Sequence, residues 1–171
     1  MKKYELTAEF IEKWGKKLFR IKALISFGSV EVGELGGYVE KEDNLAQDGN
    51  AWVYGNARVY GNARVCGDAE VYGNARVCGD AEVYGNADYL LIGRIGSRFS
   101  FTTFFKNKDK GITVSCGCFL GTIAEFRAKV SDTHGNNKHA KIYNLAADMA
   151  ELQILGEEYF DKLNTNKSEP F

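Results

Sequence analysis

Apolar and polar residues alternate with a six-residue period through the centre of the chain. From residue 53 to residue 88, each unit begins with Val and continues with Tyr or Cys, Gly, Asn or Asp, Ala and a charged residue. Between Ala57 and Tyr60, strand alternation places Ala and Val on one side and Arg and Tyr on the other. The Ala–Val side is a natural core, and the Gly–Asn pair suits a sharp corner that needs positive φ. The pattern predicts very short strands joined by turns.

These units resemble the hexapeptide-repeat superfamily, in which three units form one coil. The resemblance implies a mainly β fold: a left-handed parallel β-helix of about three coils. It also implies which residues are neighbours in the core. The expected core pairs are Val53 with Val71, Val59 with Val77, and Val65 with Val83.

Outside the expected coils, the same register implies rows of polar residues. Glu40, Arg58, Arg76 and Arg94 form one row, and Arg64 meets Glu82 as an opposite-charge pair. The tyrosines of the units form an outward surface that we predict to bind a partner or a second copy of the chain. This surface comprises Tyr54, Tyr60, Tyr72 and Tyr84.

The flanking segments follow other patterns, so we predict three parts. Residues 1–34 are expected to form an N-terminal hairpin cap with Gly15 in the turn, and Leu18, Ile21 and Leu24 as apolar anchors. Residues 35–94 form the β-helix. Residues 95–171 form a C-terminal ββαα module that ends in a loose tail.

Within the C-terminal module we expect a hairpin around residues 107–111, followed by two helices. Thr122 and Glu125 fit a capping box at the start of the first helix. The second helix is expected over residues 138–155. Its apolar stripe is predicted to comprise Ile142, Leu145, Met149, Leu152 and Ile154.

The opening segment, with its KYELTAEF and GELGGYVE stretches before the YGNA units, resembles a group of uncharacterised proteins of bacterial viruses and mobile elements. This resemblance implies a viral origin and no agreed activity. We therefore expect a non-enzymatic binding protein that blocks or sequesters a host defence component. The alternatives are a hexapeptide-repeat acyltransferase and a structural or assembly spacer.

Charge is uneven along the chain and indicates an anionic ligand. Residues 94–141 contain nine basic and three acidic residues, although the whole chain has a net charge of −1. A basic segment beside acidic ones favours an anionic partner, and intramolecular charge balance is the simpler alternative. The candidate anion-binding residues are Arg94, Arg98, His134, Lys138 and His139.

Several chemistries lack the residues they would need. The repeat contains no His, so an acyltransferase would take its base from His134 or His139. Cys116 and Cys118 are spaced C-x-C, which is not the usual spacing of a zinc site, so we expect no metal. We also expect no cofactor and no catalytic residue. No signal peptide or membrane span is predicted. We expect a homo-oligomer, dimer or trimer, in the bacterial cytoplasm, whose partner is a host defence protein or an anionic nucleotide or nucleic acid.

Overall fold

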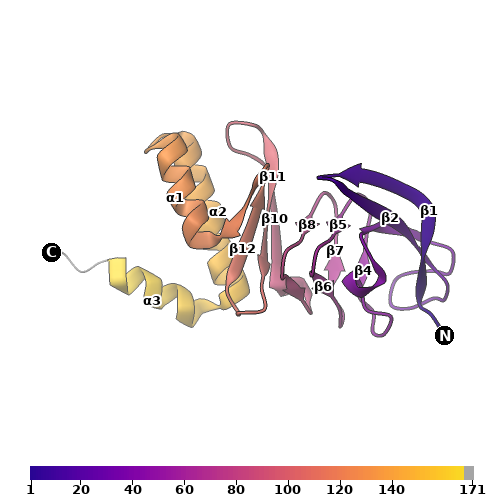
Figure 1. The fold of residues 1–171 in the computed structure, drawn as a ribbon. Coiled ribbons are helices and arrows are strands. Elements are labelled where there is room, and N and C mark those ends of the chain that lie inside the picture. The colour runs from indigo at the N-terminus through magenta and orange to yellow at the C-terminus, as the bar shows by residue number, and fades with distance from the viewer. Residues whose placement is uncertain (168–171) are drawn as a thin grey trace. The chain divides into compact units, whose positions relative to one another are not determined.

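The computed structural model describes residues 1–167 and divides the chain into two compact units, residues 1–86 and residues from 87 onward. The first unit begins with an antiparallel hairpin of β1 (Tyr4–Lys13) and β2 (Lys16–Ala23) (Figure 1). The predicted turn at Gly15 is confirmed, and Leu18 and Ile21 are buried as predicted. The prediction for Leu24 was wrong, because its side chain is exposed.

The six-residue units form strands of two residues each. These are β4 (Trp52–Val53), β5 (Arg58–Val59), β6 (Arg64–Val65), β7 (Glu70–Val71), β8 (Arg76–Val77) and β9 (Glu82–Val83). The first three pair in parallel with the strand three units later, β4 with β7, β5 with β8, and β6 with β9. The predicted neighbours Val53–Val71, Val59–Val77 and Val65–Val83 are confirmed.

The predicted fold class, a mainly β left-handed parallel β-helix, was wrong. The protein is mixed α/β, and its strands form several small separate sheets with no closed or solenoid sheet in the described chain. One sheet has five strands in the order β1-β2-β3-β5-β8, where β3 is Leu35–Val39. The N-terminal hairpin is therefore not a separate cap over coils. It continues one row of the repeat through β3, because β2 and β3 pair antiparallel while β3 and β5 pair in parallel.

The predicted register also fails at the start of the repeat. Arg58 lies opposite Tyr38, and not opposite Glu40 as the six-residue period implied. A short 3₁₀ helix, η1 (Glu42–Asn44), follows β3 and interrupts the regular spacing. The opposite-charge pair Arg64–Glu82 is confirmed as a register pair.

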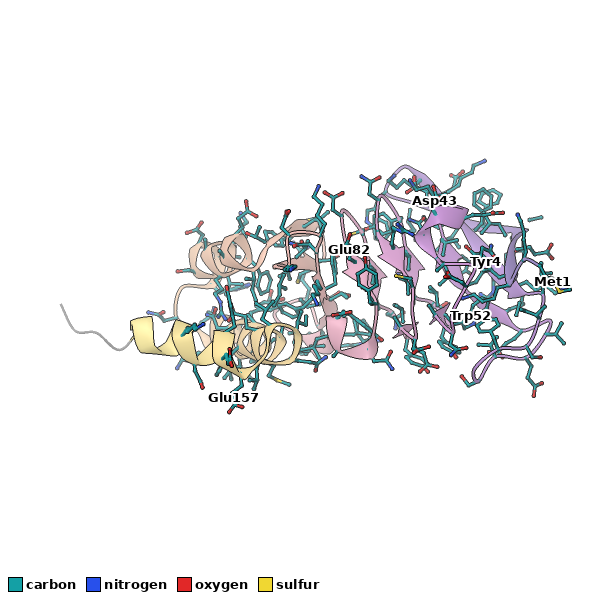
Figure 2. The ribbon with its side chains drawn as sticks, turned by 90° about the horizontal axis from the view of Figure 1, so that it is seen from below. Met1, Tyr4, Asp43, Trp52, Glu82 and Glu157 are labelled. Carbon is teal, nitrogen blue, oxygen red and sulfur yellow. The ribbon has the colours of Figure 1, made fainter. Side chains whose placement is uncertain are left out.

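Valine and alanine fill the centre of the first unit, as the alternation predicted. The valines at positions 53, 59, 65, 71, 77 and 83 are fully buried. Trp52 is fully buried as well, because the rings of Tyr4 and Phe27 cover it, with centroids at 6.1 and 5.4 Å. Figure 2 shows Tyr4 and Trp52 within this unit. Burying side chains of this size stabilises the unit by roughly 1.5–3 kcal/mol each for Val and more for the rings.

The short 3₁₀ helix η2 (Asn86–Asp88) leads into the four-stranded antiparallel sheet of the second unit. Its strands are β10 (Tyr89–Ile95), β11 (Ser100–Lys106), β12 (Ile112–Cys116) and β13 (Phe119–Thr122). The hairpin predicted around residues 107–111 is confirmed as the β11–β12 connection. The predicted ββαα order was wrong, because β10 and β13 extend the sheet on both sides.

Three helices follow: α1 (Ile123–His134), α2 (Lys138–Leu155) and α3 (Glu157–Lys167). The capping box at Thr122 is confirmed, since its side chain accepts a hydrogen bond from the Glu125 backbone N–H at 3.2 Å. α1 and α2 share one core with the sheet (Figure 1). The predicted loose tail, residues 164–171, was wrong where α3 continues to Lys167, and residues 168–171 lie outside the described part.

The apolar stripe predicted for α2 was largely wrong. Leu145, Met149 and Leu152 are exposed, and only Ile154 of the predicted set is buried. The buried face of α2 consists mainly of small residues, namely Ala140, Ala146, Ala147 and Ala150, together with Tyr143. Small side chains let this helix approach the core closely, so side-chain size misled the prediction about its orientation.

Candidate functional site

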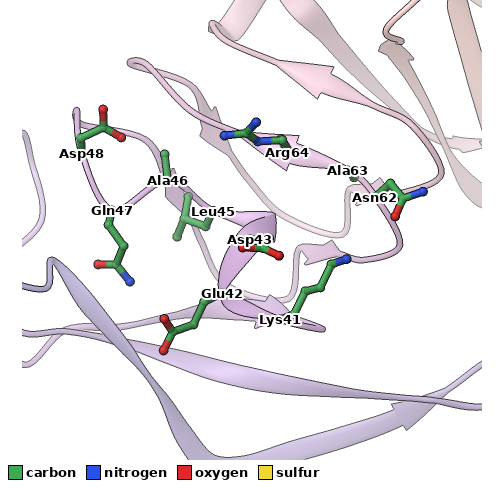
Figure 3. A pocket seen from close by; sticks show the side chains of 10 residues that line it. All are labelled: Lys41, Glu42, Asp43, Leu45, Ala46, Gln47, Asp48, Asn62, Ala63 and Arg64. Atoms are coloured by element: carbon green, nitrogen blue, oxygen red, sulfur yellow. The ribbon is translucent and has the colours of Figure 1, made fainter.

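A cavity of about 530 Å³ lies in the first unit, between the segment 41–48 and residues 62–64 (Figure 3). Its charged lining has both signs, because Lys41 and Arg64 stand with Glu42, Asp43 and Asp48. Glu42 is already paired with Lys2 at 2.7 Å. No aromatic side chain lines this cavity within the described residues. Such a mixed surface favours no particular class of ligand.

A second cavity, of about 410 Å³, lies in the second unit and has a more selective lining. Its volume falls in the range of small-molecule sites, about 300–1,000 Å³. Phe119, Phe126 and Val130 form an apolar wall, and hydroxyl and thiol groups lie around it. The residues lining this cavity are Ser97, Arg98, Ser100, Cys116, Gly117, Cys118, Phe119, Phe126, Lys129, Val130, Thr133, His134 and Tyr143. We take it as the candidate ligand site.

The charged side chains of this cavity share one sign. Arg98 and Lys129 line it, His134 adds an imidazole, and its described lining contains no Asp or Glu. The acidic residues of the neighbouring helix α2 are engaged elsewhere. Asp148 and Glu151 both accept hydrogen bonds from Arg127, at 2.7 and 2.6 Å. The cavity therefore offers cations and hydrogen-bond donors to a ligand without a competing carboxylate.

The turn between β12 and β13 shapes one side of the cavity. Cys116 lies opposite Phe119 in the register, so Gly117 and Cys118 form a two-residue hairpin turn. Gly117 has φ +59°, which suits the first central position of a type II′ turn. The Thr102 hydroxyl donates to the Cys116 Sγ at 3.2 Å. The turn and this hydrogen bond hold both cysteine side chains at the cavity.

Tyr143 of α2 closes another side and is almost fully buried. The pKa of its hydroxyl is raised to about 12, first by burial and then by the Cys116 thiol, while Arg98 acts in the opposite direction. The hydroxyl therefore stays protonated at neutral pH and is a hydrogen-bond donor. It lies directly against Gly96, where an added Cβ would stand 1.8 Å from the hydroxyl oxygen.

The structure brings together two of the five residues predicted for an anion site. Arg98 follows β10 and His134 ends α1, and both line the cavity. Arg94 is exposed on β10, and Lys138 is exposed at the start of α2. Neither of these two side chains lines the cavity in the described structure.

His139 lies beside the cavity without lining it. Its ring centroid is 5.7 Å from that of His134, and the His134 ring also neighbours Tyr143, at 5.8 Å. Its Nδ1 is buried and makes no hydrogen bond among the described residues. The backbone of His139 is fixed by Asn137, whose side chain accepts from the His139 N–H at 2.8 Å. His139 thus supports His134 from the first turn of α2.

Sequence reasoning missed Tyr143 and Thr133 as site residues. Tyr143 is the one aromatic residue on the alanine face of α2, and that interruption was the available signal. Lys129 lies in the basic segment 94–141, but no sequence pattern distinguishes it from the other lysines there. Its place on α1, one turn before Thr133, brings it to the same side of the helix.

Metal binding finds no support in the geometry of residues 1–167. No group of three or more His, Cys, Asp or Glu side chains is arranged to hold a metal ion in that range. Cys116, Cys118 and His134 line the same cavity but do not form such a group. All four cysteines are outside disulfide bonds.

The predicted tyrosine surface divides into two kinds of residue. Tyr54 and Tyr72 stack with ring centroids 4.4 Å apart, and Tyr84 is about half exposed. Tyr60 differs, because Trp14 of the N-terminal hairpin stacks on it at 5.2 Å. The pKa of Tyr60 is raised by burial and by its hydrogen bond with Cys78.

Neither a protein-family model nor a curated protein matches the chain. No helix among the described residues is long and apolar enough to cross a membrane.

Proposed function

We propose that this chain is a non-enzymatic binding protein that holds a small anionic molecule in the cavity of its second unit. One observation carries the proposal: the charged groups of that cavity, Arg98 and Lys129, are cationic, and its described lining has no carboxylate. An anion entering between them forms charge-assisted hydrogen bonds, which are about twice as strong as neutral ones.

The neutral part of the cavity indicates the rest of the ligand. Phe119 and Phe126 offer aromatic rings 5.6 Å apart, and Val130 extends this apolar wall. A planar or apolar body packs there while the anionic end meets Arg98 and Lys129. The protonated hydroxyl of Tyr143 supports binding over proton abstraction, because a group with a pKa of about 12 is a poor base at neutral pH.

Nucleotides have this combination of a planar ring and an anionic end. The resemblance to proteins of bacterial viruses suggests a role for this binding, namely to remove a nucleotide signal on which a host defence system depends. We propose sequestration as the function and a bacterial host cell as its place. A host defence protein bound to the same surface is the alternative partner.

The test is binding by the full chain to a defined panel. The panel comprises mononucleotides, cyclic mononucleotides, cyclic dinucleotides and coenzyme A, measured by thermal shift and then by calorimetry. We expect one nucleotide class to bind without chemical change, as confirmed by mass spectrometry of the recovered ligand. Acyl transfer from a coenzyme A thioester would instead make the protein an enzyme and overturn the proposal.

A matched pair of variants locates the site. Arg98→Gln removes a lining cation and should weaken binding by about tenfold or more. Lys138→Gln removes an exposed cation that does not line the cavity and should leave affinity unchanged. If the two variants behave alike, the basic segment acts only through its overall charge and the cavity is not the site.

A further inference from the structure

The five-stranded sheet of the first unit carries a pair of arginines that takes no part in the cavity of the second unit. Arg58 and Arg76 lie directly opposite each other on the parallel strands β5 and β8. Neighbouring strands are about 4.8 Å apart, so two positive charges are held side by side. Like charges directly opposite each other destabilise a sheet. At the equivalent positions one unit later, the chain has Arg64 opposite Glu82, which is the favourable arrangement.

Two acidic residues of this part of the first unit, Glu9 and Glu40, are engaged with cations other than Arg58. Glu9 lies 3.8 Å from Arg20 and accepts a hydrogen bond from the Tyr38 hydroxyl. Glu40 pairs with Lys16 at 2.6 Å and accepts from the Gly61 N–H at 2.7 Å. Neither carboxylate neutralises Arg58.

Arg58 itself is half-buried and pairs with no carboxylate among the described residues. Its Nε is inaccessible to solvent and makes no hydrogen bond within residues 1–167. The pKa of its guanidinium is lowered, first by burial and then by the charge of Arg76, and only the tyrosines Tyr38 and Tyr60 act in the opposite direction. A cation in this position gains more from an anion than a solvated arginine does.

An aromatic platform stands beside the two guanidinium groups. Trp14 comes from the turn of the N-terminal hairpin, stacks on Tyr60 at 5.2 Å, and lies 4.6 Å from the Arg76 guanidinium carbon. Trp14 has φ +54°, a conformation that bulky residues rarely adopt. Trp14 as a whole residue is 49% exposed, which leaves surface for a stacking partner beyond its contacts with Tyr60 and Arg76. Bases stack readily on such a ring.

We propose that Arg58, Arg76 and Trp14 form a second ligand site, which binds the phosphate monoester of a nucleotide and stacks its base. A phosphate monoester carries nearly two negative charges at neutral pH, which matches two guanidinium groups better than a single carboxylate does. The fork of each guanidinium fits phosphate oxygens in pairs. The site is independent of the cavity in the second unit.

The experiment measures binding of adenosine monophosphate to the full chain by calorimetry and by tryptophan emission. Only two tryptophans are present, and Trp52 is fully buried, so a ligand-induced change in emission reports on Trp14. A Trp14→Phe variant gives the baseline. We expect adenosine monophosphate to quench Trp14 and to bind at least tenfold more tightly than adenosine. Equal binding of the two would overturn the proposal.

Variants separate recognition from folding. Arg58→Gln should weaken binding at least tenfold without lowering the melting temperature, because it removes a repelled charge whose Nε makes no hydrogen bond among the described residues. Arg64→Gln is the matched control from the equivalent position of the repeat and should leave affinity unchanged. A lower melting temperature with unchanged affinity in Arg58→Gln would make the arginine structural and refute the site.

Two further experiments test whether the site prefers a phosphate monoester to diesters, and whether the ligand binds at the arginine pair or in the cavity of the second unit. A short oligonucleotide without a terminal phosphate has only singly charged diesters and should bind more weakly than adenosine monophosphate; tighter binding would refute the monoester preference. Arg98→Gln alters the cavity of the second unit and should leave Trp14 quenching intact. Loss of quenching in that variant would show that the arginine pair is not an independent site.

Discussion

Replacing Gly96 by Ala should destabilise the second unit, because the added Cβ displaces the Tyr143 ring that lines the candidate ligand cavity. Gly96 has φ +75°, where a residue with a Cβ is strained by about 1–2 kcal/mol. The new Cβ would also stand 1.8 Å from the Tyr143 hydroxyl oxygen and 2.2 Å from the ring carbon that carries it. Ordinary contact begins near 3.4 Å, so the ring has to move. Overpacking of this kind costs about 1–3 kcal/mol more.

We therefore expect Gly96→Ala to lower the free energy of unfolding by about 3 kcal/mol, measured by urea titration. Gly135→Ala is the control for backbone strain. Gly135 also has positive φ, at +55°, but an added Cβ there meets no atom within 4 Å. Adding Tyr143→Phe to Gly96→Ala should recover part of the loss, because it removes the atom nearest the new Cβ. Equal losses in Gly96→Ala and Gly135→Ala, with no recovery, would refute the placement of Tyr143.

Three further predictions concern groups that stabilise each unit. Burial lowers the pKa of Lys3 from 10.5 to about 8, so the unfolded chain binds this proton more tightly. The free energy of unfolding should then rise by about 1 kcal/mol between roughly pH 8 and 9.5, and Lys3→Met should abolish the rise in urea titrations. Arg127→Leu leaves the nearly buried Glu151 without its 2.6 Å partner and should cost about 2 kcal/mol, part of which Glu151→Gln restores. Thr122→Ala removes the cap of α1 and should cost about 1 kcal/mol in the same assay; an unchanged midpoint would contradict the capping role.

Local patterns in the sequence predicted the pieces better than their assembly. The buried valines, the Gly15 turn and the Thr122 capping box depend on neighbours along the chain, and these predictions are confirmed. The fold class depended on extending one period across the whole repeat. Two features alter how the strands are grouped into sheets. The helix η1 interrupts the repeat, and the N-terminal hairpin joins one row of repeat strands through β3. Neither feature can be recognised from the six-residue period.

The candidate site illustrates the same limit. Arg98 and His134 were predicted from charge and chemistry alone, and the structure places both at the cavity. Tyr143 was missed because the orientation of α2 was inferred from its largest apolar residues. The helix packs through its alanines, and that choice depends on how closely the sheet and helix approach. Such distances are set by tertiary contacts that one helix does not encode.

The sameness of the repeat units has a consequence for how the first unit finds its alignment. Each unit supplies the same Val and Ala to the core, so a slip of one whole unit would preserve that core. Such a slip would place Arg58 opposite Glu82 in place of Arg76 and would cost nothing in valine packing. Trp52 differs from every other residue at its position in the units, and it fits only beneath Tyr4 and Phe27. The valine and alanine core does not distinguish between these alignments, but the packing of Trp52 against Tyr4 and Phe27 does. Substitution of Trp52 is therefore the change that should reveal misaligned folding.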